Sequence, residues 1–405
     1  MNSTAESVPV LAPENPPAFV HCASEPDVLL PELPTKIPGW PWRMLAAISS
    51  AWEWVFGAGS LILALAVLAT IPVLQLLSLG YLLEVSGRIA RTGKIRSGFV
   101  GVRKAARVVS VVLGVWLFFW PLRFVSVMWS EARLIDAGGP VARQWRLILI
   151  VLSLLIVSHV VGACLRGGRL RSFLWPRPIL LLRQLLSRQS YGMARDGLWD
   201  FVSGLRLPYY FWLGLRGFTG AVLWLLVPVS LLAVSSKLQP GPGVVSGLLG
   251  GVLLMLVLLR LPLLQAAFAA ENRWAAMFEL RASRERFNRA PLALAFAIVC
   301  TLLLALPLYL LKIEIIPREA AWLPSLLFVM SIFPARVVTG WACARAARRQ
   351  QRRHWFWRLL SRLTLLPIAA AYVVIVYFTQ YLSWHGVWSL YEQHAFLLPA
   401  PFLGI

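Results

Sequence analysis

The amino-acid sequence predicts an all-α fold, that of a polytopic helical membrane protein with about eight transmembrane helices. Hydrophobic residues make up 59% of its 405 residues and charged residues only 14%, which is more apolar than a soluble chain of this size. Long runs contain no Asp, Glu, Lys or Arg, among them Trp54–Leu83 with 30 residues and Leu363–Tyr391 with 29. Because about 20 apolar residues cross the hydrocarbon core as a helix, these runs indicate transmembrane helices.

Residues 1–53 precede the first run and differ from it in composition. They contain nine prolines and six acidic residues, but only Lys36 and Arg43 as basic ones. Since proline interrupts helical hydrogen bonding, we expect a short disordered tail over 1–38. The tryptophan-rich stretch that follows suits the headgroup level of a membrane. It is expected to lead into a transmembrane domain over 54–405.

The apolar runs place the expected spans in order along the chain. They are approximately 54–83, 108–130, 147–165, 209–236, 243–270, 291–311, 320–344 and 363–383. The first run is longer than one crossing requires, and Pro72 lies inside it. The run could therefore kink or tilt as a single span, or it could fold back at Pro72 as a re-entrant hairpin.

The basic residues indicate an orientation in the membrane. Four alternate connections hold 28 of the 39 Lys and Arg residues, whereas the opposite set of connections and tails holds eight. The basic connections are 84–107, 166–216, 271–290 and 345–362. Because basic loops stay in the cytoplasm, we expect a bacterial inner-membrane protein with both termini on the non-cytoplasmic side.

The formal net charge of +22 would also suit a nucleic-acid partner. The basic residues lie beside apolar spans, however, so we expect no nucleic acid. Arg345–Arg362 mixes arginines with Trp, Phe and Leu, and Ile179–Arg188 has a similar composition. Such segments are typical of helices that lie on an anionic leaflet. The expected partner is therefore the lipid bilayer, with anionic lipids at its cytoplasmic face.

Arg123, Arg260 and Arg336 lie inside expected spans, where an arginine costs about 2.5–3.5 kcal/mol on insertion scales. They could form a polar pocket for an anionic substrate or a lipid headgroup. Alternatively, each long side chain could reach the membrane interface from near the end of its span. His159 is also intramembrane and could relay protons or bind a metal, although a lone histidine more often hydrogen-bonds to a neighbouring helix.

Gly243, Gly247 and Gly251 form a stripe with a spacing of four residues in the expected fifth span. Glycine at this spacing lets a second helix approach closely. The stripe could pack against another helix of the same chain. It could also support self-association or a hetero-oligomer.

Acidic residues beside the spans are expected to form ion pairs. Glu84 ends the first apolar run, and Arg88 follows it one helical turn later. Asp196 and Asp200 are also one turn apart and could bind a cation or act as an acid and a base. Because Arg195 is adjacent, ion pairing is the simpler expectation for them.

No catalytic, metal or nucleotide motif stands out. The sequence has no GxxxxGK[ST] loop, no HExxH and no paired CxxC, and its four cysteines are far apart. We therefore expect no cofactor and favour a non-enzymatic role. The leading hypothesis is a transporter or permease-like component. The alternatives are a non-catalytic scaffold or partner-binding subunit and, less favoured, a lipid-modifying membrane enzyme.

One local stretch resembles a known kind of protein. It runs from Gly80-Tyr-Leu-Leu-Glu84 through Gly93 and Phe99 to Arg103-Lys-Ala-Ala-Arg107. It resembles uncharacterised bacterial multi-pass membrane proteins with a domain of unknown function, in which a Gly-Tyr pair closes an early span. The resemblance is confined to the region around residues 80–107. It implies a bacterial multi-pass protein, and it carries no site residues with it.

Overall fold

The computed structural model describes residues 40–165, 173, 188–310, 322–383, 385–393 and 396–397. Within these ranges the chain is helical and contains no strand. Eight of the described helical segments are long and apolar enough to cross a membrane, so the predicted fold class is confirmed. The expected disordered tail and nearly all of the surface segment 179–188 lie outside the described residues.

Contacts divide the chain into two compact units, residues 1–51 and 52–405. Of the first unit, the structure describes the beginning of helix α1. The candidate site residues all belong to the second unit.

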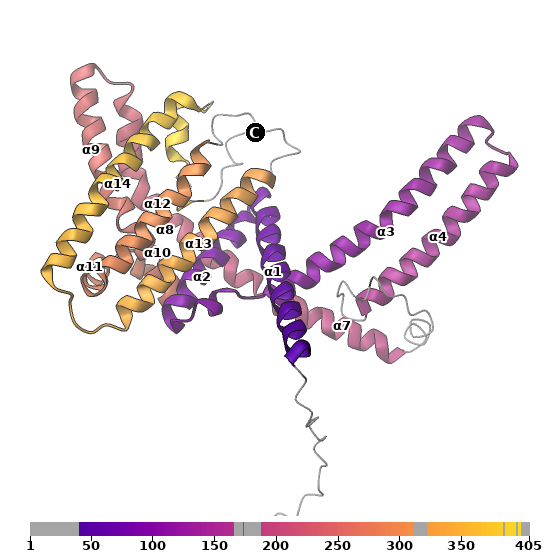
Figure 1. The fold of residues 1–405 in the computed structure, drawn as a ribbon. Helices are drawn as coiled ribbons and strands as arrows, with labels where there is room; N and C mark the ends of the chain where they lie inside the picture. Colours follow the sequence, from indigo (N-terminus) through magenta and orange to yellow (C-terminus); the bar gives the residue numbers. More distant parts are fainter. Residues whose placement is uncertain are drawn as a thin grey trace, which may run out of the picture. The chain divides into compact units, whose positions relative to one another are not determined.

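The α-helices follow one another along the chain (Figure 1). Their bounds are α1 Trp40–Thr70, α2 Gln75–Thr92, α3 Val102–Ile135, α4 Pro140–Leu165, α7 Arg188–Ser203, α8 Leu207–Ser235, α9 Pro240–Leu258, α10 Leu261–Glu271, α11 Leu280–Arg289, α12 Pro291–Leu310, α13 Trp322–Ala347 and α14 Trp355–Leu382. Short 3₁₀ helices are η1 Ile95–Gly98, η2 Trp274–Met277 and η4 Gly386–Tyr391. The second to eighth expected spans correspond to helices in the structure. They match α3, α4, α8, the pair α9 and α10, α12, α13 and α14.

The first expected span, 54–83, is corrected by the structure, because it is not one helix. α1 ends at Thr70 and α2 begins at Gln75. Between them Val73 adopts a left-handed backbone with a φ of 70°. Pro72 has no amide hydrogen to donate to a continuing helix, which favours a break at this point.

After the break, α2 folds back along α1. The Ser78 hydroxyl donates a hydrogen bond to the carbonyl oxygen of Leu65 at 3.1 Å, so residues on either side of the turn lie opposite each other. Farther from the turn, the rings of Trp54 and Phe99 are 5.1 Å apart. The beginning of the apolar run and the basic segment after α2 therefore lie at the same end of a helical hairpin.

α2 is enclosed by other helices. It packs against α8, α10 and α13, and its leucines 79, 82 and 83 are almost fully buried. The closest approach is to α8, at Gly80 and Gly214. A Cβ atom added to Gly80 would lie 1.8 Å from the carbonyl oxygen of Tyr210. Only the absence of side chains at these glycines allows the two backbones to touch.

The glycines of α9 face α8 with a different spacing from the predicted stripe. An added Cβ would lie 2.9 Å from α8 backbone atoms at both Gly243 and Gly250. At Gly247 and Gly251 it would meet its nearest neighbours at 3.5 and 3.6 Å, which is ordinary contact. Close packing within the chain thus uses two glycines seven residues apart, and only Gly243 belongs to the predicted stripe.

α3 and α4 form a helical hairpin of their own (Figure 1). Large apolar side chains are exposed on both helices, for example Trp116 and Trp120 on α3 and Leu154 on α4. Exposed apolar side chains on helices of this length suit contact with lipid acyl chains.

Candidate functional site

The three arginines that the sequence places in expected spans have different environments. Arg123 is exposed on α3, and Arg260 is half-buried at the junction between α9 and α10. Arg336 lies near the middle of α13 and is 3% exposed. The three residues therefore do not form one pocket, and only Arg336 is a buried cation within a helix that could cross the membrane.

The Arg336 guanidinium is only partly satisfied. Its Nη1 donates to the side-chain oxygen of Gln265 at 2.8 Å. Its Nε and Nη2 are buried and have no hydrogen-bond partner in the part of the chain that the structure describes. Within the same ranges no carboxylate forms an ion pair with Arg336. Nε and Nη2 are the adjacent donors with which arginine grips a carboxylate or a phosphate in a bidentate manner.

Gln265 connects Arg336 to the C-terminal segment. The Gln265 amide nitrogen donates to the backbone carbonyl of Phe396 at 3.3 Å. The Phe396 amide in turn donates to the backbone carbonyl of Gln393 at 3.1 Å. Gln265, Gln393 and Phe396 are all completely buried. The segment after η4 therefore enters the bundle and places main-chain polar groups next to the Arg336–Gln265 pair.

The polar contacts continue from Gln393 to two tyrosines. The Tyr309 hydroxyl reaches the Gln393 side-chain oxygen at 3.5 Å and the Tyr372 hydroxyl at 3.0 Å. These residues come from α12, α14 and the C-terminal segment. We call the set Arg336, Gln265, Phe396, Gln393, Tyr309 and Tyr372 the polar chain.

The Arg336 guanidinium has the chemical features that favour an anion as partner. A buried charge is costly unless it is paired and hydrogen-bonded. Gln265 is neutral and satisfies only one of the guanidinium nitrogens. A small anion at Nε and Nη2 would provide both the missing charge and the missing acceptors.

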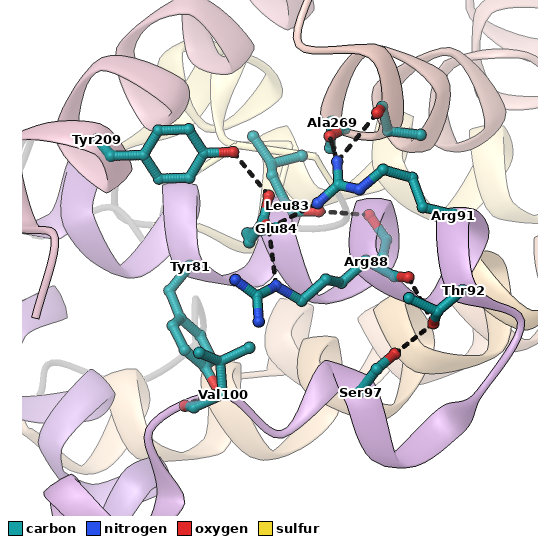
Figure 2. Close-up of polar contacts among 12 residues, drawn as sticks. Tyr81, Leu83, Glu84, Arg88, Arg91, Thr92, Ser97, Val100, Tyr209 and Ala269 are labelled. Carbon is teal, nitrogen blue, oxygen red and sulfur yellow. Dashed lines mark hydrogen bonds and ion pairs between the residues drawn. The ribbon is translucent and has the colours of Figure 1, made fainter. Parts of the chain in front are cut away.

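A second polar cluster surrounds Glu84, and it is saturated by its own partners (Figure 2). The Glu84 carboxylate is 3% exposed and accepts from Arg88 Nε at 3.0 Å, Arg91 Nη2 at 2.7 Å and the Tyr209 hydroxyl at 2.8 Å. Arg91 also donates to the carbonyl of Ala269 at 2.7 Å. The cluster joins α2, α8 and α10. The predicted pairing of Glu84 with Arg88 is confirmed.

His159 and Asp196 contact neighbouring residues. His159 Nε2 is 2.8 Å from the carbonyl oxygen of Phe173, and its ring lies 4.7 Å from that of Phe118. Asp196 pairs with Arg195 at 3.1 Å on an exposed surface. In the described ranges no group of three or more His, Cys, Asp or Glu side chains could hold a metal ion.

Sequence reasoning found Arg336 but missed the residues that surround it. Gln265, Tyr309, Tyr372 and Gln393 are polar residues within or just after charge-free runs, and that property was the available signal. Their proximity could not be read from the sequence, because Gln265 and Arg336 are 71 positions apart.

Comparisons of the chain with protein-family models, with curated proteins and with solved structures found no match.

Proposed function

We propose that this multi-pass membrane protein transports a small anion and that Arg336 binds the anion inside the bundle. One observation carries the proposal: two buried guanidinium donors in the middle of an apolar helix have no partner among the residues that the structure describes. Ionisable groups inside a membrane are costly and mark substrate pathways in transport proteins. The expected substrate carries a carboxylate, a phosphate or another compact anionic group, because such groups match the two free donors.

The polar chain favours transport over a scaffold role. A scaffold needs only apolar packing between its helices, and a buried cation would weaken that packing. A transporter needs polar groups along the route of its substrate. The polar chain supplies such groups from Arg336 on α13 to Tyr309 on α12 and Tyr372 on α14.

The Arg336→Gln variant tests this function in proteoliposomes. Liposomes containing the full-length protein are loaded with valinomycin and transferred to potassium chloride, nitrate, phosphate or succinate, and swelling is followed by light scattering. We expect anion-dependent swelling with at least one salt. Arg336→Gln should slow it roughly tenfold or more, because losing a charge-assisted contact costs at least about 1.4 kcal/mol.

Arg123→Gln is the matched control, because it removes the same charge from an exposed position. It should leave the swelling rate unchanged. Two results would contradict the proposal: no swelling above that of protein-free liposomes with any of the four salts, or equal rates for Arg336→Gln and the unaltered protein.

We further propose that the basic segments face the cytoplasm, with a cytoplasmic N-terminus and a non-cytoplasmic C-terminus. This proposal revises the expected non-cytoplasmic position of the N-terminus. The α1–α2 hairpin supports the revision, because it puts the start of the apolar run beside the basic segment after α2. The hairpin thus returns to the side on which it begins, and the seven later candidate spans place the C-terminus on the opposite side. A green fluorescent protein fused to the N-terminus should fluoresce, and alkaline phosphatase fused to the C-terminus should be active. Alkaline phosphatase activity from an N-terminal fusion would instead favour 54–83 as a single crossing.

A further inference from the structure

An arginine-lined cavity of about 350 Å³ lies between α9, α10, α11 and α14. Arg260 comes from the α9–α10 junction, Arg284 from α11 and Arg362 from α14. We call this cavity the arginine pocket. It shares no residue with the polar chain, so an inference about it does not depend on the proposed transport function.

Among the described residues, the three guanidinium groups of the arginine pocket have no counter-charge, and no acidic residue lines the cavity. In the described ranges, none of the three arginines forms an ion pair, and Arg362 has a single weak contact, from Nη2 to the Asn288 side-chain oxygen at 3.4 Å. Like charges around one cavity repel each other unless an anion lies between them. The cavity is therefore electrostatically suited to a phosphate group.

The remaining wall of the arginine pocket is mostly apolar and continues onto exposed surfaces of α9 and α14. Leu259 and Leu365 line the interior, while Leu256 and Leu366 are 48% and 41% exposed. Leu256 and Leu366 belong to two of the helical segments that could cross a membrane. A ligand with an anionic head and a hydrocarbon tail would satisfy both parts of the wall, whereas inorganic phosphate would use only the arginines.

A second cavity lined by arginines is a weaker candidate for an anion site than the arginine pocket. It is lined by Arg345, Arg349 and Arg353. The Arg345 guanidinium lies over the Trp341 ring at 5.5 Å, and that of Arg353 lies over the Trp357 ring at 5.7 Å. Cation–π contacts already stabilise those two cations. The arginines of the arginine pocket have no such ring contact in the part of the chain that the structure describes.

We propose that the arginine pocket binds one anionic phospholipid. Its phosphate lies between Arg260, Arg284 and Arg362, and its acyl chains leave along Leu256 and Leu366 into the bilayer. The cavity has room for a headgroup, while the chains remain in the membrane. Arg260 thus has a defined role at the break between α9 and α10, where it faces the lipid headgroup.

Native mass spectrometry of the full-length protein tests this site. The protein in detergent is titrated with dioleoyl phosphatidylglycerol, dioleoyl phosphatidylcholine or sodium phosphate, and the fraction that carries one bound molecule is measured. We expect one phosphatidylglycerol to bind more tightly than phosphatidylcholine. Replacing Arg260, Arg284 and Arg362 together with glutamine should weaken it roughly 100-fold, because each basic residue contributes to headgroup attraction.

The charge-matched control replaces Arg345, Arg349 and Arg353 with glutamine and should keep the phosphatidylglycerol affinity within about threefold. Arg284→Gln and Arg362→Gln alone, both at exposed positions, should each weaken binding without affecting folding. Equal affinity for the two lipids, an equal loss in the control variant, or displacement of phosphatidylglycerol by sodium phosphate at similar concentration would overturn the proposal.

Discussion

Replacing Gly80 with alanine should destabilise the protein by roughly 3 kcal/mol, the upper end of the usual cost of overpacking a core. The new Cβ would lie 1.8 Å from the Tyr210 carbonyl oxygen and 2.9 Å from the Gly214 amide nitrogen. Both of those atoms belong to the α8 backbone, which cannot rotate away as a side chain can. α2 and α8 would have to separate, and the Glu84 contact to Tyr209 would be strained with them.

The effect of Gly80→Ala is measured as the midpoint of thermal unfolding of the purified protein in detergent. Gly59→Ala is the control, since it adds the same methyl group to an exposed helical position. There the new Cβ would have no described atom within 4 Å apart from its chain neighbours and the backbone of its own helix. Alanine favours a helix by about 1 kcal/mol over glycine, so Gly59→Ala should be neutral or slightly stabilising. If both variants unfold at the same temperature, the close α2–α8 contact does not exist in the folded protein.

Glu84→Gln should be the second strongly destabilising change, at roughly 2–3 kcal/mol. Glutamine keeps the shape of the side chain but removes the charge that holds Arg88 and Arg91. Breaking a fully buried ion pair costs about 3–5 kcal/mol. The expected loss is smaller here because the side chains of Arg88 and Arg91 are 32% and 39% exposed and can recover water.

Glu285→Gln is the matched control for Glu84→Gln. Glu285 also faces two arginines, Arg289 and Arg352, but at 3.9 Å and with 56% of its side chain exposed. Exposed ion pairs contribute about 0–1 kcal/mol, so this variant should unfold almost as the unaltered protein does. Similar losses in both variants would mean that the burial of Glu84 does not strengthen its ion pairs.

Contacts within one helix could be predicted from the sequence, whereas contacts between residues far apart in the chain could not. The Glu84–Arg88 pair follows from a spacing of one helical turn, and the structure contains it at 3.0 Å. Arg91 adds a second pair from the same helix, but the hydroxyl of Tyr209 comes from 125 positions away. No periodicity within α2 could indicate that α8 would present a tyrosine there.

The fold of the first apolar run also could not be predicted from local sequence alone. Its length and Pro72 allowed either one tilted span or a hairpin. The choice depended on whether Ser78 and its neighbours found partners on α1, on α8 and on α13, which are separate parts of the chain. Tertiary packing selected the hairpin, because α2 carries Gln75, Glu84 and Ser86 and is stabilised by burial in protein rather than in lipid.

The sequence by itself determined the class of the protein and the approximate positions of its helices. Lipid excludes charge and unsatisfied backbone groups, so a membrane helix must be apolar over its whole length, and that property is visible in any window of the chain. The tertiary structure alone decided which arginine of the expected spans is buried. Arg123, Arg260 and Arg336 look alike in sequence. Among these three, only Arg336 is almost fully buried, and two of its buried donors have no partner among the described residues.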